Sequence, residues 1–181
     1  MELTLEKAKQ MMAENGGNLD LFNDSRYTKL PKGLTVCGSL DISRTRITEL
    51  PEGLTVGGTF FMNHTKVKEL PEGLIVRGSL DVCYTGVTEL PKGLTVGGSL
   101  DVSHTGVTEL LEGLTVRGLL DVSHTGITEL PEGLTVGGTF FMNHSKVKEL
   151  PEGLIVGGSL DICYTGITEL PEGMTIGGGF I

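Results

Sequence analysis

All four histidines of the chain fall in one column of positions separated by multiples of 20 residues. The members of this column are His64, His104, His124 and His144, together with Tyr84, Tyr164 and Arg44. Imidazole binds many transition metals, and Asp101 and Asp121 each precede a histidine by three residues. Two imidazoles and a carboxylate could therefore approach an ion. Copying of a repeat explains the column, however, and it does not supply three ligands that converge on one point, so we expect no metal site.

The sequence contains no recognisable catalytic motif. It lacks a serine nucleophile elbow, a Gly-x-x-x-x-Gly-Lys phosphate loop and a paired Cys-x-x-Cys. The Val-Gly-Gly segments lack the lysine and the following helix that phosphate binding needs. We therefore expect neither enzymatic activity nor a bound cofactor.

Two phenylalanines interrupt a column of aspartates. The aspartates are Asp41, Asp81, Asp101, Asp121 and Asp161, and the two intervening places hold Phe61 and Phe141. Lys66 and Lys146 each follow one of these phenylalanines by five residues. Two exposed aromatic side chains, each with a lysine nearby, are one candidate pair of anchors for a protein interface. The alternative is that each ring simply packs on its neighbours at the surface.

Glutamates form two long columns in a chain whose formal net charge is −9. The first column is Glu49, Glu69, Glu89, Glu109, Glu129, Glu149 and Glu169, and the second is Glu52, Glu72, Glu112, Glu132, Glu152 and Glu172. Such a surface repels nucleic-acid phosphates and anionic membranes, so we expect direct binding to neither. A solvated face that resists aggregation is the simplest interpretation. The alternative is an acidic mimic of nucleic acid that occupies a DNA-binding protein.

The columns arise from a strict period of 20 residues that begins at Leu30. It predicts seven full repeats and a remainder from Leu170, in one domain over residues 30–181 that continues a segment at 1–29. The position after each leading leucine is proline in every repeat except at Leu111. Apolar and polar residues alternate in Leu100–Val102 and again in Leu94–Val96, which predicts two short strands per repeat. Stacked copies would bury a continuous apolar core.

The segment Leu100-x-Val102-x-x-Thr105-x-Val107 resembles the core of the leucine-rich repeat (LRR), with threonine where that family usually has asparagine. Segments such as Thr128–Leu134, which reads Thr-Glu-Leu-Pro-Glu-Gly-Leu, are most similar to the short repeats of bacterial and phage proteins, including effectors of enteric pathogens. The resemblance implies a right-handed α/β solenoid with a parallel sheet and few or no helices in the repeats. It also implies a role in protein recognition.

In LRR proteins the strand face and its rim commonly contact the partner, so the resemblance places the candidate contacts there. The partner-binding residues that we expect are Phe61, Phe141, His64, Tyr84, His104, His124, His144, Tyr164, Lys66 and Lys146. A partner protein of unknown identity is therefore the first hypothesis.

The two ends of the chain differ from the repeats. Residues 3–15 predict an amphipathic helix with Thr4 as N-cap, which would cap the first coil, and residues 18–21 resemble a first strand offset by one residue. No secretory signal precedes them, and three cysteines fit a reducing compartment, so we expect a cytoplasmic protein. The C-terminal residues Gly178–Ile181 align with the predicted strand that contains Phe140 and Phe141. Pairing of two chains through this strand edge would give a homodimer.

Overall fold

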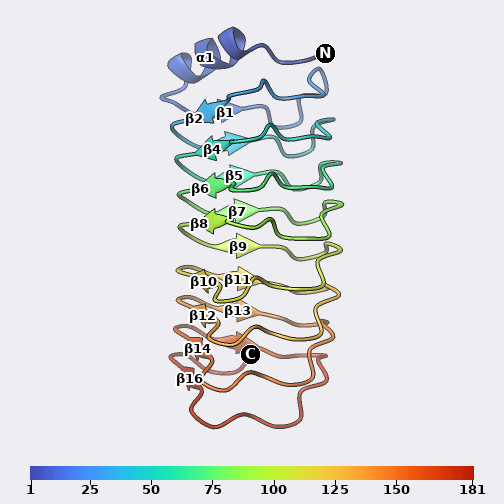
Figure 1. Ribbon diagram of the computed structural model, residues 1–181, viewed down its shortest axis with the longest axis vertical. Coiled ribbons are helices and arrows are strands. Elements are labelled where there is room, and N and C mark those ends of the chain that lie inside the picture. The colour runs from blue at the N-terminus through green and yellow to red at the C-terminus, as the bar shows by residue number, and fades with distance from the viewer.

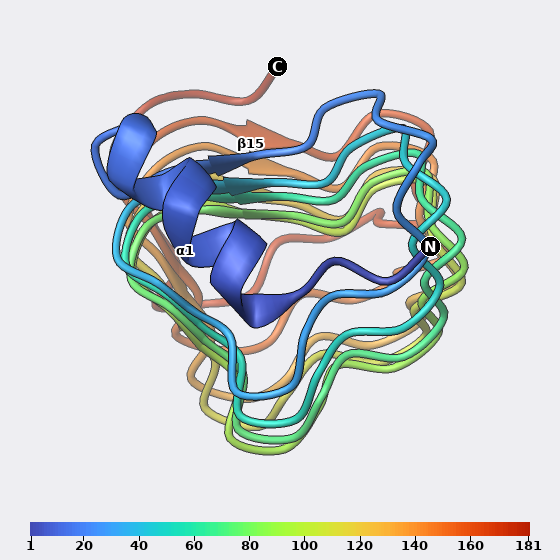
Figure 2. The same cartoon turned by 90° about the horizontal axis from the view of Figure 1, so that it is seen from above.

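The computed structural model describes residues 1–181 and shows a single parallel β-solenoid with one helix at its N-terminal end (Figure 1). Successive turns of 20 residues stack along the long axis, and seen along that axis they superimpose into one outline (Figure 2). This architecture confirms the solenoid that the repeat and the LRR resemblance predicted. It contains no helix with the length and apolar character needed to cross a membrane.

One side of the coil is a continuous sheet of eight parallel strands, each two residues long. The strands, in order, are β1 (Leu19–Asp20), β3 (Leu40–Asp41), β5 (Phe60–Phe61), β7 (Leu80–Asp81), β9 (Leu100–Asp101), β11 (Leu120–Asp121), β13 (Phe140–Phe141) and β15 (Leu160–Asp161). Neighbours pair in register, so that Leu100 lies beside Leu120 and Asp101 beside Asp121. The first residue of each strand points into the core and the second points outward. The two columns of the sequence that form these strands thus become straight rows on this sheet, which we call the main sheet.

A second set of short strands lies on another side of the coil, but it does not form one sheet. The strands β2 (Thr35–Val36), β4 (Thr55–Val56), β6 (Ile75–Val76) and β8 (Thr95–Val96) form one four-stranded sheet. The strands β10 (Thr115–Val116), β12 (Thr135–Val136), β14 (Ile155–Val156) and β16 (Thr175–Ile176) form another. Strands β8 and β10 do not pair, and Figure 1 shows a wider separation between them than between their neighbours.

A single apolar core runs the length of the solenoid and contains 41 buried residues. Phe60 and Phe140 occupy the place that leucine holds in the other coils, and both are fully buried beside Met62 and Met142. Flexible methionine side chains fill the irregular space beside a large ring better than branched residues would. The two phenylalanine coils therefore keep the same backbone path as the leucine coils.

The threonine column satisfies its hydroxyls within each turn. Thr45, Thr85, Thr105, Thr125 and Thr165 each donate to the carbonyl oxygen three residues earlier, at 2.5–2.7 Å. In the two phenylalanine coils the equivalent hydroxyls of Thr65 and Ser145 are buried without a partner. A buried hydroxyl without a hydrogen bond destabilises the fold by about 1–3 kcal/mol. The phenylalanine coils are thus locally less well satisfied than the others.

The N-terminal helix α1 (Leu5–Glu14) covers the first coil, as the sequence predicted. The Thr4 hydroxyl accepts from the Lys7 amide at 3.2 Å, and the helix is followed by Gly16 and Gly17, both with positive φ. Ala8 is completely buried on the side that faces the solenoid. Figure 2 shows α1 lying across the end of the coil, where it closes the apolar interior.

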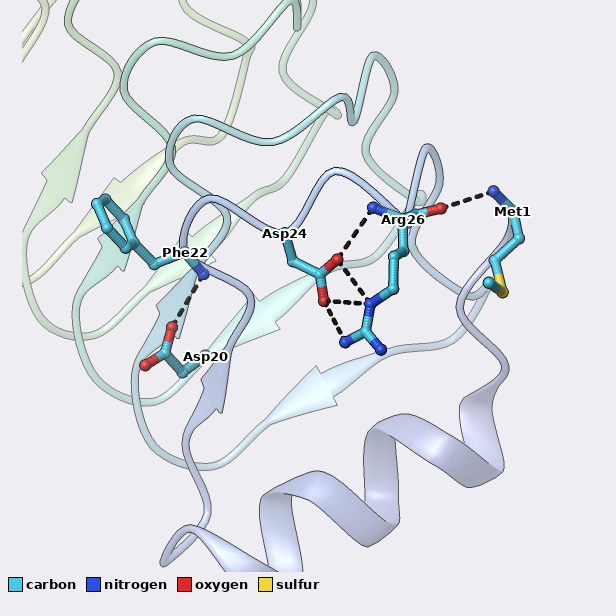
Figure 3. A network of polar contacts seen from close by, with 5 residues as sticks. All are labelled: Met1, Asp20, Phe22, Asp24 and Arg26. Atoms are coloured by element: carbon cyan, nitrogen blue, oxygen red, sulfur yellow. Dashed lines mark hydrogen bonds and ion pairs between the residues drawn. The ribbon is translucent and has the colours of Figure 1, made fainter.

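The expected offset of the first strand is also confirmed, since Leu19 pairs with Leu40, 21 residues later. The loop after β1 is held by local polar contacts (Figure 3): the Asp20 carboxylate accepts from the Phe22 amide, and Asp24 pairs with Arg26 at 2.6 Å. The Arg26 guanidinium lowers the pKa of Asp24 through the hydrogen bonds that it donates. The N-terminal ammonium of Met1 donates to the Arg26 carbonyl at 2.7 Å, which ties the start of the chain to this loop.

Candidate functional site

Six aromatic side chains form an uninterrupted stack beside the main sheet. We call this stack the aromatic ladder, and its members are His64, Tyr84, His104, His124, His144 and Tyr164. Neighbouring ring centroids lie 4.3–4.7 Å apart, and the planes of neighbouring rings differ by 7–17°. All six residues are exposed, and Tyr164 is 80% exposed. The ladder is therefore a rigid aromatic edge that faces solvent.

The backbone turn after each main strand positions these rings. Every ladder residue has a φ of 54–56°, in the left-handed region that non-glycine residues rarely adopt. Before four of the six ladder residues the strand ends in an aspartate that holds the turn; for example, the Ser103 amide donates to Asp101 Oδ1 at 2.9 Å and the Ser123 amide donates to Asp121 Oδ1 at 2.8 Å. The strands before His64 and His144 end in phenylalanine instead. The amide of each ladder residue up to His144 then donates to the next coil, as His104 does to the Ser123 carbonyl at 3.0 Å. These bonds set the rings at the spacing of the strands.

The left-handed turns are costly, and the stack helps to offset them. A residue held in this conformation costs on the order of 1–3 kcal/mol, while an offset aromatic pair contributes about 0.5–1.5 kcal/mol. Because each internal ring has two stacked neighbours, side-chain motion is restricted from both sides. The ladder thus presents its ring edges in a fixed arrangement before any partner arrives.

The geometry of the ladder does not favour a metal site. The planes of His104 and His124 differ by only 15°, so their in-plane nitrogen lone pairs run side by side. A tetrahedral site would need ligands that converge on one ion at about 2.0–2.1 Å. Among the cation-binding residue types, the group whose ligand atoms do gather is Asp81, Cys83 and Asp101, within 4.8 Å of one another.

Cys83 was not among the sequence candidates, although its position two residues after Asp81 was a usable signal. Its amide donates to Asp81 Oδ1 at 3.0 Å, which places the thiol beside the carboxylates. Burial, together with the contact to Asp81, raises the pKa of the Cys83 thiol far above its ordinary value. Burial also raises the pKa of the Asp101 carboxyl. A thiol kept protonated is a weak nucleophile and a weak ligand, so we assign this group no chemistry.

Phe61 and Phe141 lie on the outward face of the main sheet, where the sequence placed them. Phe61 is 39% exposed and sits in register between Asp41 and Asp81, whereas Phe141 is partly covered. The Asn63 side chain donates to Asp81 Oδ2 at 2.7 Å, and Asn143 makes the same bond to Asp161 at 3.0 Å. Lys66 and Lys146 are both exposed nearby in sequence. Asp161, unlike the other strand aspartates, is buried in the last complete coil.

The glutamate columns occupy another part of each turn. From Glu69 onward, their members follow the aromatic residue of the same coil by five and eight residues. Every member of both columns is exposed. One of them, Glu49, pairs with Lys29 at 3.1 Å. The acidic surface and the aromatic ladder are therefore distinct surfaces that could be altered separately.

Comparison with known proteins supports the fold. No protein-family model and no curated protein matches the sequence. Among solved structures, the chain is similar to the LRR domain of a Shigella effector, with a TM-score of 0.60 at 20% sequence identity. The match covers 91% of this chain and 76% of that domain. The likeness extends over nearly the whole solenoid and concerns its fold.

Proposed function

We propose that this protein is a recognition scaffold that binds a partner protein on the face of its main sheet. The observation that carries the proposal is the aromatic ladder, a fixed row of exposed rings beside a continuous eight-stranded sheet. Solenoids of the LRR type are typically interaction scaffolds, and the main sheet, with eight strands, is the longest sheet of this one. The identity of the partner is not part of the proposal.

The ladder has the properties of a good contact surface. Aromatic side chains contribute much of the binding energy in protein interfaces, particularly where they are rigid before binding. The ring edges of histidine and tyrosine also offer hydrogen-bond donors and acceptors to a polar partner surface. Because stacking already restricts the rings, binding would lose little side-chain entropy here.

Phe61 and Phe141 extend this surface onto the strands. The segments at 59–86 and 139–166 differ at only three of 28 positions, so the two phenylalanines sit in nearly identical surroundings four coils apart. At about 4.8 Å per coil, the two rings are separated by roughly 19 Å. A partner that spans several coils would contact both, with Lys66 and Lys146 at the edge of the contact.

The second candidate function is mimicry of nucleic acid by the glutamate columns. The observation that favours it is that all members of both columns are exposed and almost none is paired with a cation. A basic, DNA-binding partner would recognise such a surface by charge. This function uses a different surface from the aromatic ladder, so mutations can separate the two.

The test is capture of binding proteins from extract of the source cell with three forms of the immobilised protein. The first is Phe61→Ala/Phe141→Ala, which removes both exposed rings. The second is Ile75→Ala/Ile155→Ala, a matched control in the same duplicated coils, because Ile75 and Ile155 are exposed on the second set of strands at 39% and 45%. The third reverses Glu69, Glu89 and Glu109 to lysine. Circular dichroism and thermal melting verify that each form is folded.

We expect the phenylalanine double variant to lose the specific partner by about tenfold or more, because truncation of an interface anchor typically costs at least 1–2 kcal/mol. The isoleucine control should retain it. Loss on charge reversal with full retention by the phenylalanine variant would support the mimic instead and refute recognition through the strand face.

A further inference from the structure

The gap between β8 and β10 leaves two strand edges unpaired inside the solenoid. At the neighbouring junction the backbone hydrogen bonds between the strands are complete: the Thr95 amide donates to the Leu74 carbonyl at 3.0 Å and the Gly97 amide to the Val76 carbonyl at 2.9 Å. The amides of Thr115 and Arg117 make no such bonds to Leu94 and Val96. Two carbonyl oxygens on one edge therefore face two N–H groups on the other without being joined. The gap ends at the next residue, where the Gly118 amide donates to the Gly98 carbonyl at 3.2 Å.

The gap also opens the core to solvent. Leu94, Val96 and Leu114 are only partly buried, whereas their counterparts in most other coils are completely buried. A hollow of about 780 Å³ lies between the two edges, lined by these apolar residues and by the turns on either side. This volume falls within the range of ligand-binding clefts.

Two sequence changes are unique to this coil: Leu111, where every other coil has proline, and Leu119, where every other full repeat has serine or threonine. Only Leu111 lines the hollow. Arg117 alone does not explain the gap, because Arg77 occupies the same column and still donates its amide to Val56 at 2.9 Å. Proline fixes φ near −65° and shapes the turn that precedes each second strand. Leucine does not restrain φ in this way, although the turn keeps the Leu114 to Leu111 bond, at 3.1 Å, that several of the proline turns also make. The Leu111 side chain lines the hollow.

The rim of the hollow is basic on a protein that is otherwise acidic. Arg77, Lys92 and Arg117 line it, against a single carboxylate, Glu112. Arg77 and Arg117 flank Gly97, which has no side chain to separate them. A ligand in the hollow would therefore meet unpaired backbone groups, apolar side chains and a positive rim together.

We propose that this opening binds an extended acidic segment of a partner protein as an additional β-strand. Strands β8 and β10 run in the same direction, so one inserted strand parallel to both would complete both ladders. An apolar side chain of the segment would fill the space between Val96 and Val116. The next residue would point outward, where a carboxylate would meet Arg117 and Arg77. This surface is separate from the face of the main sheet, and the proposal stands independently of the one made for that face.

The probe is a blocked, fluorescently labelled peptide of sequence Gly-Leu-Thr-Val-Glu-Gly-Glu. It copies the second strand of this chain's own repeat and places a carboxylate after the inward valine. Two control peptides carry lysine in place of both glutamates, or N-methyl groups on the backbone amides that would pair with β8. Binding is measured by fluorescence anisotropy at low salt with the intact chain.

We expect saturable binding of the acidic peptide, weakened about tenfold or more by Arg77→Glu/Arg117→Glu, since a charge reversal removes an attraction and adds a repulsion. Arg44→Glu/Arg46→Glu makes the same change in net charge at exposed positions away from the opening and should leave binding unchanged. Both control peptides should bind at least about tenfold more weakly. Hydrogen–deuterium exchange should be fast at the Thr115 and Arg117 amides of the free protein and slow when peptide is bound.

Three results would overturn the proposal. One is equal binding by the two arginine double variants, and another is equal binding of the N-methylated peptide, which would show attraction without strand pairing. The third is protection of Thr115 and Arg117 that rises with protein concentration in the absence of peptide. That result would mean that a second copy of this chain, and not an acidic partner segment, occupies the opening.

Discussion

The two strand-bearing sides of the solenoid respond differently to the same repeat. The main sheet runs unbroken through eight strands, including two coils in which phenylalanine replaces both residues of the strand. The second side is divided in two at the coil in which leucine replaces proline. The main sheet keeps its pairing where two phenylalanines replace leucine and aspartate. On the second side, the replacement of one turn proline by leucine coincides with the loss of strand pairing.

The difference follows from what holds each side in place. Main-sheet residues bond to neighbouring coils at the strand and again at the turn that follows, where the aspartates and the aromatic ladder add further contacts. The second side has three backbone bonds at the junction of β6 and β8, donated by Thr95, Gly97 and Gly98, and no row of stacked side chains beside them. Proline, whose φ is fixed, begins the turn that leads into every second strand except β10. The side with fewer contacts between coils separates more easily, and a separated pair of strand edges can bind a ligand.

The largest expected effect comes from truncating a core leucine behind the second set of strands. We compare a coil whose second strand is paired on both sides with the coil at the gap. Leu134 is completely buried, whereas Leu114, one coil earlier, is partly exposed in the hollow. We expect Leu134→Ala to lower the free energy of unfolding by about 2–4 kcal/mol and Leu114→Ala by roughly half as much. Urea denaturation measures both. Equal losses would mean that the hollow is closed in solution.

The homodimer expected from the sequence remains a prediction. It would form through the C-terminal coil, where apolar residues that earlier coils bury are exposed. In the last coil Leu170 is 50% exposed and Phe180 is 48% exposed, whereas Leu150, one coil earlier, is 7% exposed. Phe180 makes only an isolated bridge to Leu160. Light scattering should give the mass of a dimer, and Phe180→Asp should give that of a monomer. A wild-type monomer at every concentration would rule out pairing through this edge.

Placing proline at position 111, as in the other coils, should make the second set of strands continuous like the main sheet. We expect Leu111→Pro to allow β8 and β10 to pair, to slow hydrogen exchange at the Thr115 and Arg117 amides, and to stabilise the protein by about 0.5–1 kcal/mol. Leu111→Ala is the control, because it shortens the side chain without fixing φ. Unchanged exchange in the proline variant would show that the turn does not govern the break.

The smallest effect is a pH dependence on the main sheet. Burial raises the pKa of Asp101 above its ordinary value of 3.8, so the native state binds this proton more tightly than the unfolded state does. The resulting destabilisation is present above the raised pKa and disappears as the pH falls through it towards 3.8. Asp101→Asn should therefore raise the free energy of unfolding at pH 7 by less than about 1 kcal/mol, after allowance for solvent screening. This gain should vanish in melts at pH 3.5, and a gain independent of pH would point to a different cause.

Much of this architecture could be predicted from the sequence, because a period without insertions fixes the register of every column. The capping helix, the offset strand at Leu19 and the row of His and Tyr residues follow from residue type and spacing alone. The parallel stacking of the rings does not, since it depends on left-handed φ values that histidine and tyrosine rarely adopt. The sequence identified Leu111 as an exception, but the spacing of the repeat does not reveal that β8 and β10 fail to pair beside it.

The most direct test of recognition through the main sheet is site-specific photocrosslinking to a captured partner. A p-benzoylphenylalanine at position 61 would lie on the main sheet, and the same group at position 75 would lie on the second side of a neighbouring coil. Both positions are exposed to a similar extent, so reactivity alone does not distinguish them. The proposal predicts a crosslink to the partner from position 61 and none from position 75. A crosslink from position 75 alone would place the partner on the opposite side and contradict it.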